Sequence, residues 1–157
     1  YSQKLFADNG IDVEFVQDNH SHSSQGVLRG LHFQKPPYAQ AKLIRVTQGE
    51  VVDVAVDLRP DSPTFGQWET AHLSADNKKM FFVPTGFAHG FYVISKTVDF
   101  QYKCSNYYHK ESEGGLLWND PEIGIEWPLM DDAPILSNKD INGKPFAEAE
   151  LFDSLGI

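Results

Sequence analysis

The sequence has little of what marks a secreted, membrane or nucleic-acid-binding protein. Its single cysteine, Cys104, excludes an internal disulfide and is typical of a reducing compartment such as the cytoplasm. No run approaches the roughly 18 consecutive apolar residues of a membrane-spanning helix, and no signal peptide is visible. The 157 residues include 13 Lys and Arg against 22 Asp and Glu, a net charge of −9, without a basic run. We therefore expect neither a nucleic acid nor a membrane as partner.

Long windows with a helical period are also absent, whereas short strand-type runs recur between turn residues. KLIRV and EVVDVAVDL flank Thr47-Gln48-Gly49, a pattern that predicts a β-hairpin. KMFFVP, GFYVIS and VDFQYKC predict further strands, and the last places Tyr102 and Cys104 on one face. After Asn142 a short helix is expected around FAEAELFDSL. The pattern predicts one all-β domain over residues 1–157, an antiparallel jelly roll with a short C-terminal helical tail.

Two segments indicate that this jelly roll is of the cupin type. PTGFAH, residues 84–89, matches the Pro-x-Gly-x-x-His core of the second cupin motif, and GVLRGLH matches the start of the first. Metal-binding cupins continue the first motif with His-x-His and then a Glu. Here Gln34 replaces the second His, and the following KPPYA offers no carboxylate. Because catalytic transition-metal sites usually take three or more protein ligands, we expect no metal here.

His32 is then core filler, a binding group or a base. The run around it supplies Arg29, Gln34 and Lys42, more polar groups than a packed strand needs. An imidazole suits proton transfer at neutral pH, a tyrosine hydroxyl can return a proton, and a lysine can stabilise an oxyanion. With Tyr102 and Lys42, His32 therefore suits abstraction of a proton next to a carbonyl. The basic residues available for an anionic small molecule are Arg29, Lys42, Arg45, Lys103 and Lys139, and the histidines expected in solvent are His22, His72 and His109.

Six segments, in this order, resemble the dTDP-4-dehydrorhamnose 3,5-epimerase family over about residues 15–140. They are FVQDNHSHSSQGVLRGLHFQ, QAKLIRVTQGEVVDVAVDLRPDSPTFGQW, PTGFAHGF, YKCSNYY, EGGLLWNDPEIGIEWP and LSNKD. The resemblance implies a cytoplasmic, homodimeric cupin without metal or cofactor that acts in dTDP-L-rhamnose biosynthesis. Such an isomerase inverts C3 and C5 of dTDP-4-dehydro-6-deoxyglucose, on either side of the C4 ketone.

The resemblance also implies a role for each matching residue. The implied catalytic residues are the base His32, its orienting carboxylate Asp140, the acid Tyr102 and the enolate-stabilising Lys42. The implied substrate-binding residues are Gln17, Asp18, Asn19, Arg29, Lys42, His89, Tyr108, Glu113 and Lys139. Among these, Tyr108 is expected to stack on the thymine.

Two features require attention. Arg29 and His32 are three residues apart, so strict strand alternation puts them on opposite faces, and both reach one pocket only if the strand bulges at Gly30. The family also carries an N-terminal segment that crosses to the partner subunit; it is expected upstream of Tyr1. Three alternatives stay open: an epimerase that inverts only one centre, a metal-dependent cupin and a non-catalytic sugar-nucleotide-binding cupin.

Overall fold

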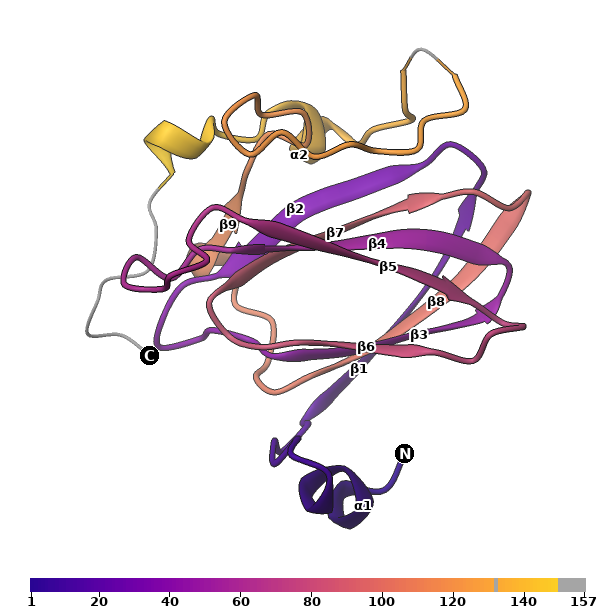
Figure 1. The fold of residues 1–157 in the computed structure, drawn as a ribbon, viewed down its shortest axis with the longest axis vertical. Helices are drawn as coiled ribbons and strands as arrows, with labels where there is room; N and C mark the ends of the chain where they lie inside the picture. The colour runs from indigo at the N-terminus through magenta and orange to yellow at the C-terminus, as the bar shows by residue number, and fades with distance from the viewer. Residues whose placement is uncertain (132, 150–157) are drawn as a thin grey trace.

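The protein is an antiparallel two-sheet jelly roll (Figure 1). The structure, a computed structural model, describes residues 1–131 and 133–149. The first sheet holds, in spatial order, β1 (Gln17–Ser24), β8 (Thr97–Cys104), β3 (Lys42–Gln48) and β6 (Met80–Val83). The second holds β5 (Trp68–Ser74), β4 (Glu50–Asp57), β7 (Phe87–Val93), β2 (Leu28–Gln34) and β9 (Glu113–Gly115). The predicted jelly roll is confirmed.

The predicted hairpin between β3 and β4 is wrong. β3 pairs with β6 and β8, whereas β4 pairs with β5 and β7 in the other sheet. The turn at Gly49 therefore carries the chain from one sheet to the other. Gly49 has a φ of +77°, and a Cβ there would collide with the carbonyl oxygen of Thr97. Turn residues predict a change of direction, but the pairing of the strands depends on the packing of the whole barrel.

Two apolar clusters bury both faces of the five-stranded sheet. The inner cluster lies between the sheets and includes Ile44, Ala55 and Phe100. The outer cluster includes Val54 and Leu116 and lies where the segment after β9 crosses the sheet's outer side (Figure 1). Alternation along β4 consequently points side chains into two cores.

The helices are short and peripheral. They are α1 (Gln3–Asp8), the 3-10 turn Lys110–Ser112, α2 (Asn138–Ile141) and the 3-10 turn Phe146–Glu148. Helix α1 was not expected from the sequence; it is capped at its start by Ser2 and lies beyond the four-stranded sheet (Figure 1). Of the predicted C-terminal helix only the turn at Phe146–Glu148 falls among the described residues, and the remainder lies mostly outside them. Within residues 1–131 and 133–149, no helix has the length and apolar character needed to cross a membrane.

Candidate active site

A cavity of about 360 Å³ lies between the two sheets and collects most of the predicted catalytic residues. The β2–β7 side contributes His32 and His89, which stand opposite each other in the strand pairing. The other sheet contributes Lys42 from β3 and Tyr102 from β8. The remaining lining residues are Asn19, His20, Ser21, His22, Ser23, Arg29, Phe91 and Phe100.

His32 is paired with a buried carboxylate. Its Nε2 lies 2.7 Å from Oδ1 of Asp140, whose side chain is completely buried. Nε2 makes no well-aligned hydrogen bond, because its N–H bond does not point at the carboxylate oxygen. The pair is therefore a short electrostatic contact. Nε2 is thus the ring nitrogen that faces Asp140. This is the arrangement of a carboxylate that orients an imidazole base.

Asp140 is held in its charged form by neighbouring donors. It lies on α2, where it forms a capping box with Ser137 and also accepts a hydrogen bond from the backbone N–H of Gly30. Burial alone opposes ionisation, but the contacts from His32, Ser137 and Gly30 outweigh it and hold the pKa of Asp140 well below its usual range. Asp140 is therefore an anion held beside Nε2 of His32.

A bulge in β2 brings Arg29 to the same cavity as His32. The register against β7 shifts between these two residues, as the position of Gly30 predicted. Gly30 has a φ of +122°, and a Cβ there would lie 2.6 Å from Cα of Gly90. Nη1 of Arg29 lies 3.7 Å from Oδ2 of Asp140. The close approach of two glycines therefore permits the bend that puts a cation beside the imidazole.

The opposite sheet supplies Tyr102 and Lys42, for which the roles of acid and enolate-stabilising cation are predictions from the sequence. The Nζ of Lys42 lies 5.8 Å from the centre of the Tyr102 ring. Burial lowers the pKa of Lys42, partly countered by Cys104, Asp53 and Glu113. Burial also raises the pKa of Tyr102 to about 12, so this phenol keeps its proton at neutral pH. A protonated donor thus lies across the cavity from the imidazole.

A second histidine–carboxylate pair, not expected from the sequence, lies beside the first. Nε2 of His89 is hydrogen-bonded to Oδ1 of Asp53 over 2.7 Å, and both side chains are buried. Burial lowers the pKa of His89, although Asp53 opposes this shift, and the lowered pKa favours the neutral imidazole. Burial raises the pKa of Asp53. The only hint in the sequence was an acid within the otherwise apolar run VVDVAV. His89 is therefore suited to hydrogen bonding in the cavity.

Five of the residues expected to bind the nucleotide form a hydrogen-bonded group, and of these Asn19 also lines the cavity of His32. The hydroxyl of Tyr108 donates to Glu113 over 3.0 Å, and Glu113 also pairs with Lys139, the residue before Asp140. Gln17 accepts from the backbone N–H of Tyr108 and donates to Asn19. Tyr108 is 56% exposed, so its ring is open to a ligand.

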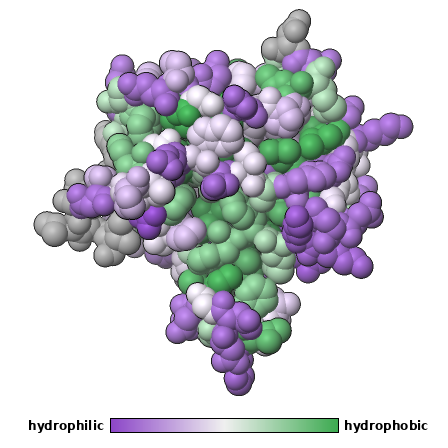
Figure 2. All heavy atoms as spheres, viewed as in Figure 1, coloured by the Kyte–Doolittle hydropathy of each residue, from purple (hydrophilic) through white to green (hydrophobic). Residues whose placement is uncertain are grey.

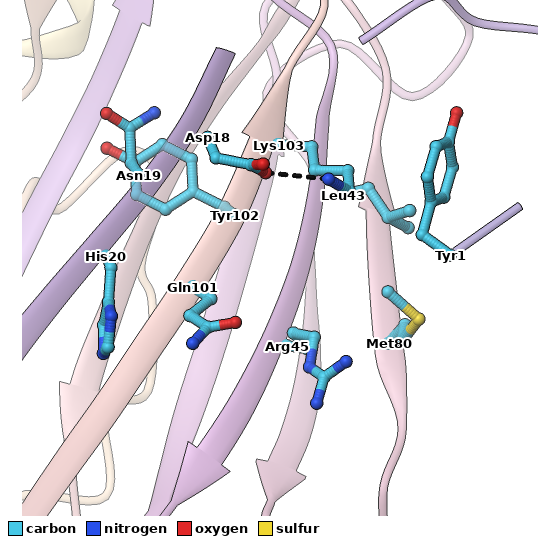
Figure 3. A pocket seen from close by; sticks show the side chains of 10 residues that line it. All are labelled: Tyr1, Asp18, Asn19, His20, Leu43, Arg45, Met80, Gln101, Tyr102 and Lys103. Atoms are coloured by element: carbon cyan, nitrogen blue, oxygen red, sulfur yellow. Dashed lines mark hydrogen bonds and ion pairs between the residues drawn. The ribbon is translucent and has the colours of Figure 1, made fainter. Parts of the chain in front are cut away.

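Asp18 departs from this group. Strand alternation turns it away from Gln17 and Asn19, and its exposed carboxylate forms an ion pair with Lys103 over 2.8 Å. It lines a second pocket of about 400 Å³, shown in Figure 3, which Arg45 and Lys103 also line. The structure therefore does not bring Asp18, Arg45 or Lys103 into the cavity of His32.

Other histidines differ from one another. His22 and His72 are exposed, as expected, and each contacts a carboxylate. His109 is not simply solvated: its ring stacks on Tyr38 at 3.7 Å. Among the residues that the structure describes, no three or more His, Cys, Asp or Glu side chains are grouped to hold a metal ion.

Fold and cavity together define a class: a cupin-type jelly roll whose interior carries an imidazole–carboxylate pair facing a tyrosine and a lysine. The chain belongs to the dTDP-4-dehydrorhamnose 3,5-epimerase family, whose profile matches residues 1–148. It is 56% identical over 153 residues to the dTDP-4-dehydrorhamnose 3,5-epimerase of Shigella flexneri, covering 97% of this chain and 83% of the relative. It is 59% identical over 131 residues to that of Escherichia coli K12, covering 83% and 70%.

Solved structures agree with this assignment. A Legionella pneumophila 3,5-epimerase in complex with dTDP-4-keto-L-rhamnose has a TM-score of 0.90 and 50% identity, covering 94% of this chain and 78% of that one. A 3′-monoepimerase from Streptomyces bikiniensis in complex with dTDP-quinovose has a TM-score of 0.86 and 34% identity, covering 94% and 74%. The fold is thus shared by an enzyme described as a 3,5-epimerase, which acts at two centres, and by one described as a monoepimerase, which acts at one.

Proposed function

We propose that this protein is a dTDP-4-dehydrorhamnose 3,5-epimerase, an isomerase that inverts C3 and C5 of dTDP-4-dehydro-6-deoxyglucose. The observation that carries the proposal is the His32–Asp140 pair facing Tyr102 and Lys42 across one cavity. Both carbons are acidified by the same C4 carbonyl, so one base and one acid can serve both if the sugar ring repositions. The reaction changes no oxidation state, and its balance requires only proton transfers.

Each inversion takes two steps in this geometry. His32 takes the proton from the carbon, and the electron pair moves through the new double bond to the C4 oxygen. The ammonium of Lys42 stabilises this enolate. Tyr102 then donates its proton to the opposite face of the carbon, and the carbonyl re-forms. Before the next inversion His32 gives its proton to solvent and Tyr102 regains one from solvent. Each positioned proton-transfer group of this kind typically contributes about 10²–10⁴ in rate.

The proposed binding roles are supported by the charge and the hydrogen bonds of each residue. Arg29 and Lys139 supply positive charge for the diphosphate of a dTDP-sugar. Tyr108 offers an exposed ring for stacking on the thymine, and Gln17, Asn19, His89 and Glu113 supply hydrogen bonds. Asp18 is proposed as an indirect contributor, because its carboxylate engages Lys103.

The whole chain is proposed to act as one unit, in the cytoplasm and as a homodimer. Its single cysteine, Cys104, is buried and forms no disulfide, which fits the proposed reducing compartment.

Exposed apolar side chains support the proposed dimer. They lie on α1 and near the outer side of the four-stranded sheet: Tyr1, Leu5, Val16 and Met80. Figure 2 shows hydrophobic residues gathered on the face above α1. A second copy that covers this area would remove it from water.

Proton exchange tests the proposal directly. The protein is incubated with dTDP-4-dehydro-6-deoxyglucose in D₂O, and deuterium at C3 and C5 is followed by NMR and mass spectrometry, with His32→Ala in parallel. We expect deuterium at both carbons of the inverted product, lost in the variant. Deuterium at one carbon alone would identify a single-centre epimerase. Tight binding of the nucleotide without exchange would leave a binding protein and overturn the proposal.

A further inference from the structure

Gln34, which stands where a metal-binding cupin carries its second histidine, is fully engaged with two loops. The side chain ends β2 and is only 5% exposed. Its Nε2 donates to the backbone carbonyl of Tyr38 over 2.7 Å and to that of Tyr107 over 3.2 Å. Its Oε1 accepts from the backbone N–H of His109 over 2.8 Å. Both amide hydrogens and the carbonyl oxygen are thus committed to backbone groups.

These contacts lie on either side of Tyr108. Gln34 holds the carbonyl of Tyr107 and the N–H of His109, while Gln17 accepts from the N–H of Tyr108 itself over 3.1 Å. The backbone at Tyr108 is therefore fixed by two glutamine side chains from neighbouring parts of the barrel. Its ring nevertheless projects into solvent, 56% exposed. A mobile aromatic side chain does not need such anchoring, whereas a ring preset for a ligand gains from it.

The same loop is fastened to the segment after β2 by further contacts. The ring of His109 stacks on Tyr38. Nε2 of Gln40 donates to the carbonyl of Asn106 over 2.8 Å. Gln34 joins the segment after β2 to the loop of Tyr108, because its Nε2 donates to the carbonyls of Tyr38 and Tyr107.

We propose that Gln34 is a positioning residue for nucleobase recognition. Its amide holds the Tyr108 loop so that the ring is preset to stack on the base while its hydroxyl engages Glu113. The inference rests on the proposed function, in which Tyr108 receives the thymine. Gln34, at the position where metal-binding cupins carry a histidine ligand, is thus given a role in binding. In that role it contacts neither the reacting carbons nor His32.

The test compares Gln34→Met with Gln48→Met. Methionine keeps the length and burial of glutamine but makes none of the three hydrogen bonds. Gln48 lies at the far end of β3 and donates to Thr97. Gln48→Met therefore removes a glutamine hydrogen bond away from the cavity and serves as the matched control. We expect Gln34→Met to raise the Kd for dTDP and the KM about tenfold, a part of the range that base stacking provides. We expect kcat and the Kd for pyrophosphate, which has no base, to change less than about twofold.

A double-mutant comparison separates positioning from general stability. In a Tyr108→Ala background, Gln34→Met should raise the Kd for dTDP less than about twofold, because the ring that it positions is gone. An equal effect in both backgrounds, or a fall of kcat and Tm together, would show a purely structural role and overturn the inference. If Gln34→Met does not fold, Gln34→Glu carries the test, since it keeps the acceptor for His109 and loses both donors.

Failure of the proposed function would be recognised separately. A wild-type protein that binds no dTDP, or binds it without epimerising the sugar, refutes that proposal before any variant is compared. A wild-type protein that epimerises, combined with an unchanged dTDP affinity in folded Gln34→Met, refutes only the role of Gln34.

Discussion

At the scale of single residues, the cavity depends on one carboxylate, that of Asp140, which specific donors keep charged. Asp140 receives contacts from His32, Ser137 and Gly30 and has no solvent exposure. Its lowered pKa means that the folded state favours the anion more than the unfolded state does. The same contacts that orient His32 therefore also stabilise the fold.

Asp140→Asn tests both effects. We expect kcat to fall by about 10²–10⁴, because the ring loses its orienting charge. Since the folded-state pKa is lowered, the stability contributed by Asp140 is fully present above the unfolded value of about 3.9 and declines as the pH falls below it. Urea unfolding of wild type and variant between pH 7 and pH 3 should show a stability difference that shrinks with acidification. A constant difference would contradict a contribution from ionisation.

Lys42 is expected to set the alkaline limit of activity. Burial lowers the pKa of Lys42, so this side chain loses its enolate-stabilising positive charge at a pH below the usual lysine pKa. Tyr102, with a pKa of about 12, still keeps its proton at that pH. The profile of kcat/KM should therefore fall at a pH under about 10.4. Lys42→Arg, which stays charged, should move this limb upward even if its activity is lower. An unmoved limb in the variant would assign the titration to another group.

At the scale of elements, the bulge of β2 is the feature that gathers Arg29, His32 and Asp140. It needs two glycines in contact, because a Cβ on Gly30 would lie 2.7 Å from the carbonyl oxygen of His89. The inserted residue changes which side chains face inward, so the strand contributes both a cation and a base. The local departure from alternation is thus part of the candidate site.

Gly30→Ala should disrupt this element. We expect a loss of about 2–5 kcal/mol in the free energy of unfolding from the combined strain of the positive φ and the collision with β7, and a loss of most activity. Gly10→Ala is the matched control, since Gly10 also has a positive φ, +93°, but has no atom within 4 Å of the added Cβ. Chemical denaturation and the epimerase assay measure both effects. Equal losses in the two variants would show that backbone strain alone matters.

At the scale of the whole molecule, an acidic chain is proposed to bind an anionic substrate. The net charge is −9, yet Arg29 and Lys42 line the cavity of His32, and Lys139 is the neighbour in sequence of Asp140. Local arrangement of charge, rather than the total, decides which ligand is attracted.

The proposed dimer is a prediction at this scale. We expect a species of about twice the chain mass of 17.7 kDa in light scattering or analytical ultracentrifugation. Met80→Lys on the outer side of the four-stranded sheet should weaken it, because a charge would be buried with no partner. A single species at the mass of one chain at micromolar concentration would contradict the dimer.

The sequence by itself determined the jelly roll, the strand faces of Tyr102 and Cys104, and the bulge at Gly30, because side-chain alternation and backbone conformation are local properties. It also supplied, through resemblance, several residues that line the cavity, among them His32, Lys42 and Tyr102. Only the tertiary structure decided that β3 and β4 lie in different sheets, that Asp53 pairs with His89, that Asp18 turns away, and that Gln34 holds the Tyr108 loop. Those outcomes depend on contacts between segments that are apart in the sequence, such as Asp53 with His89, which packing selects and no local pattern encodes.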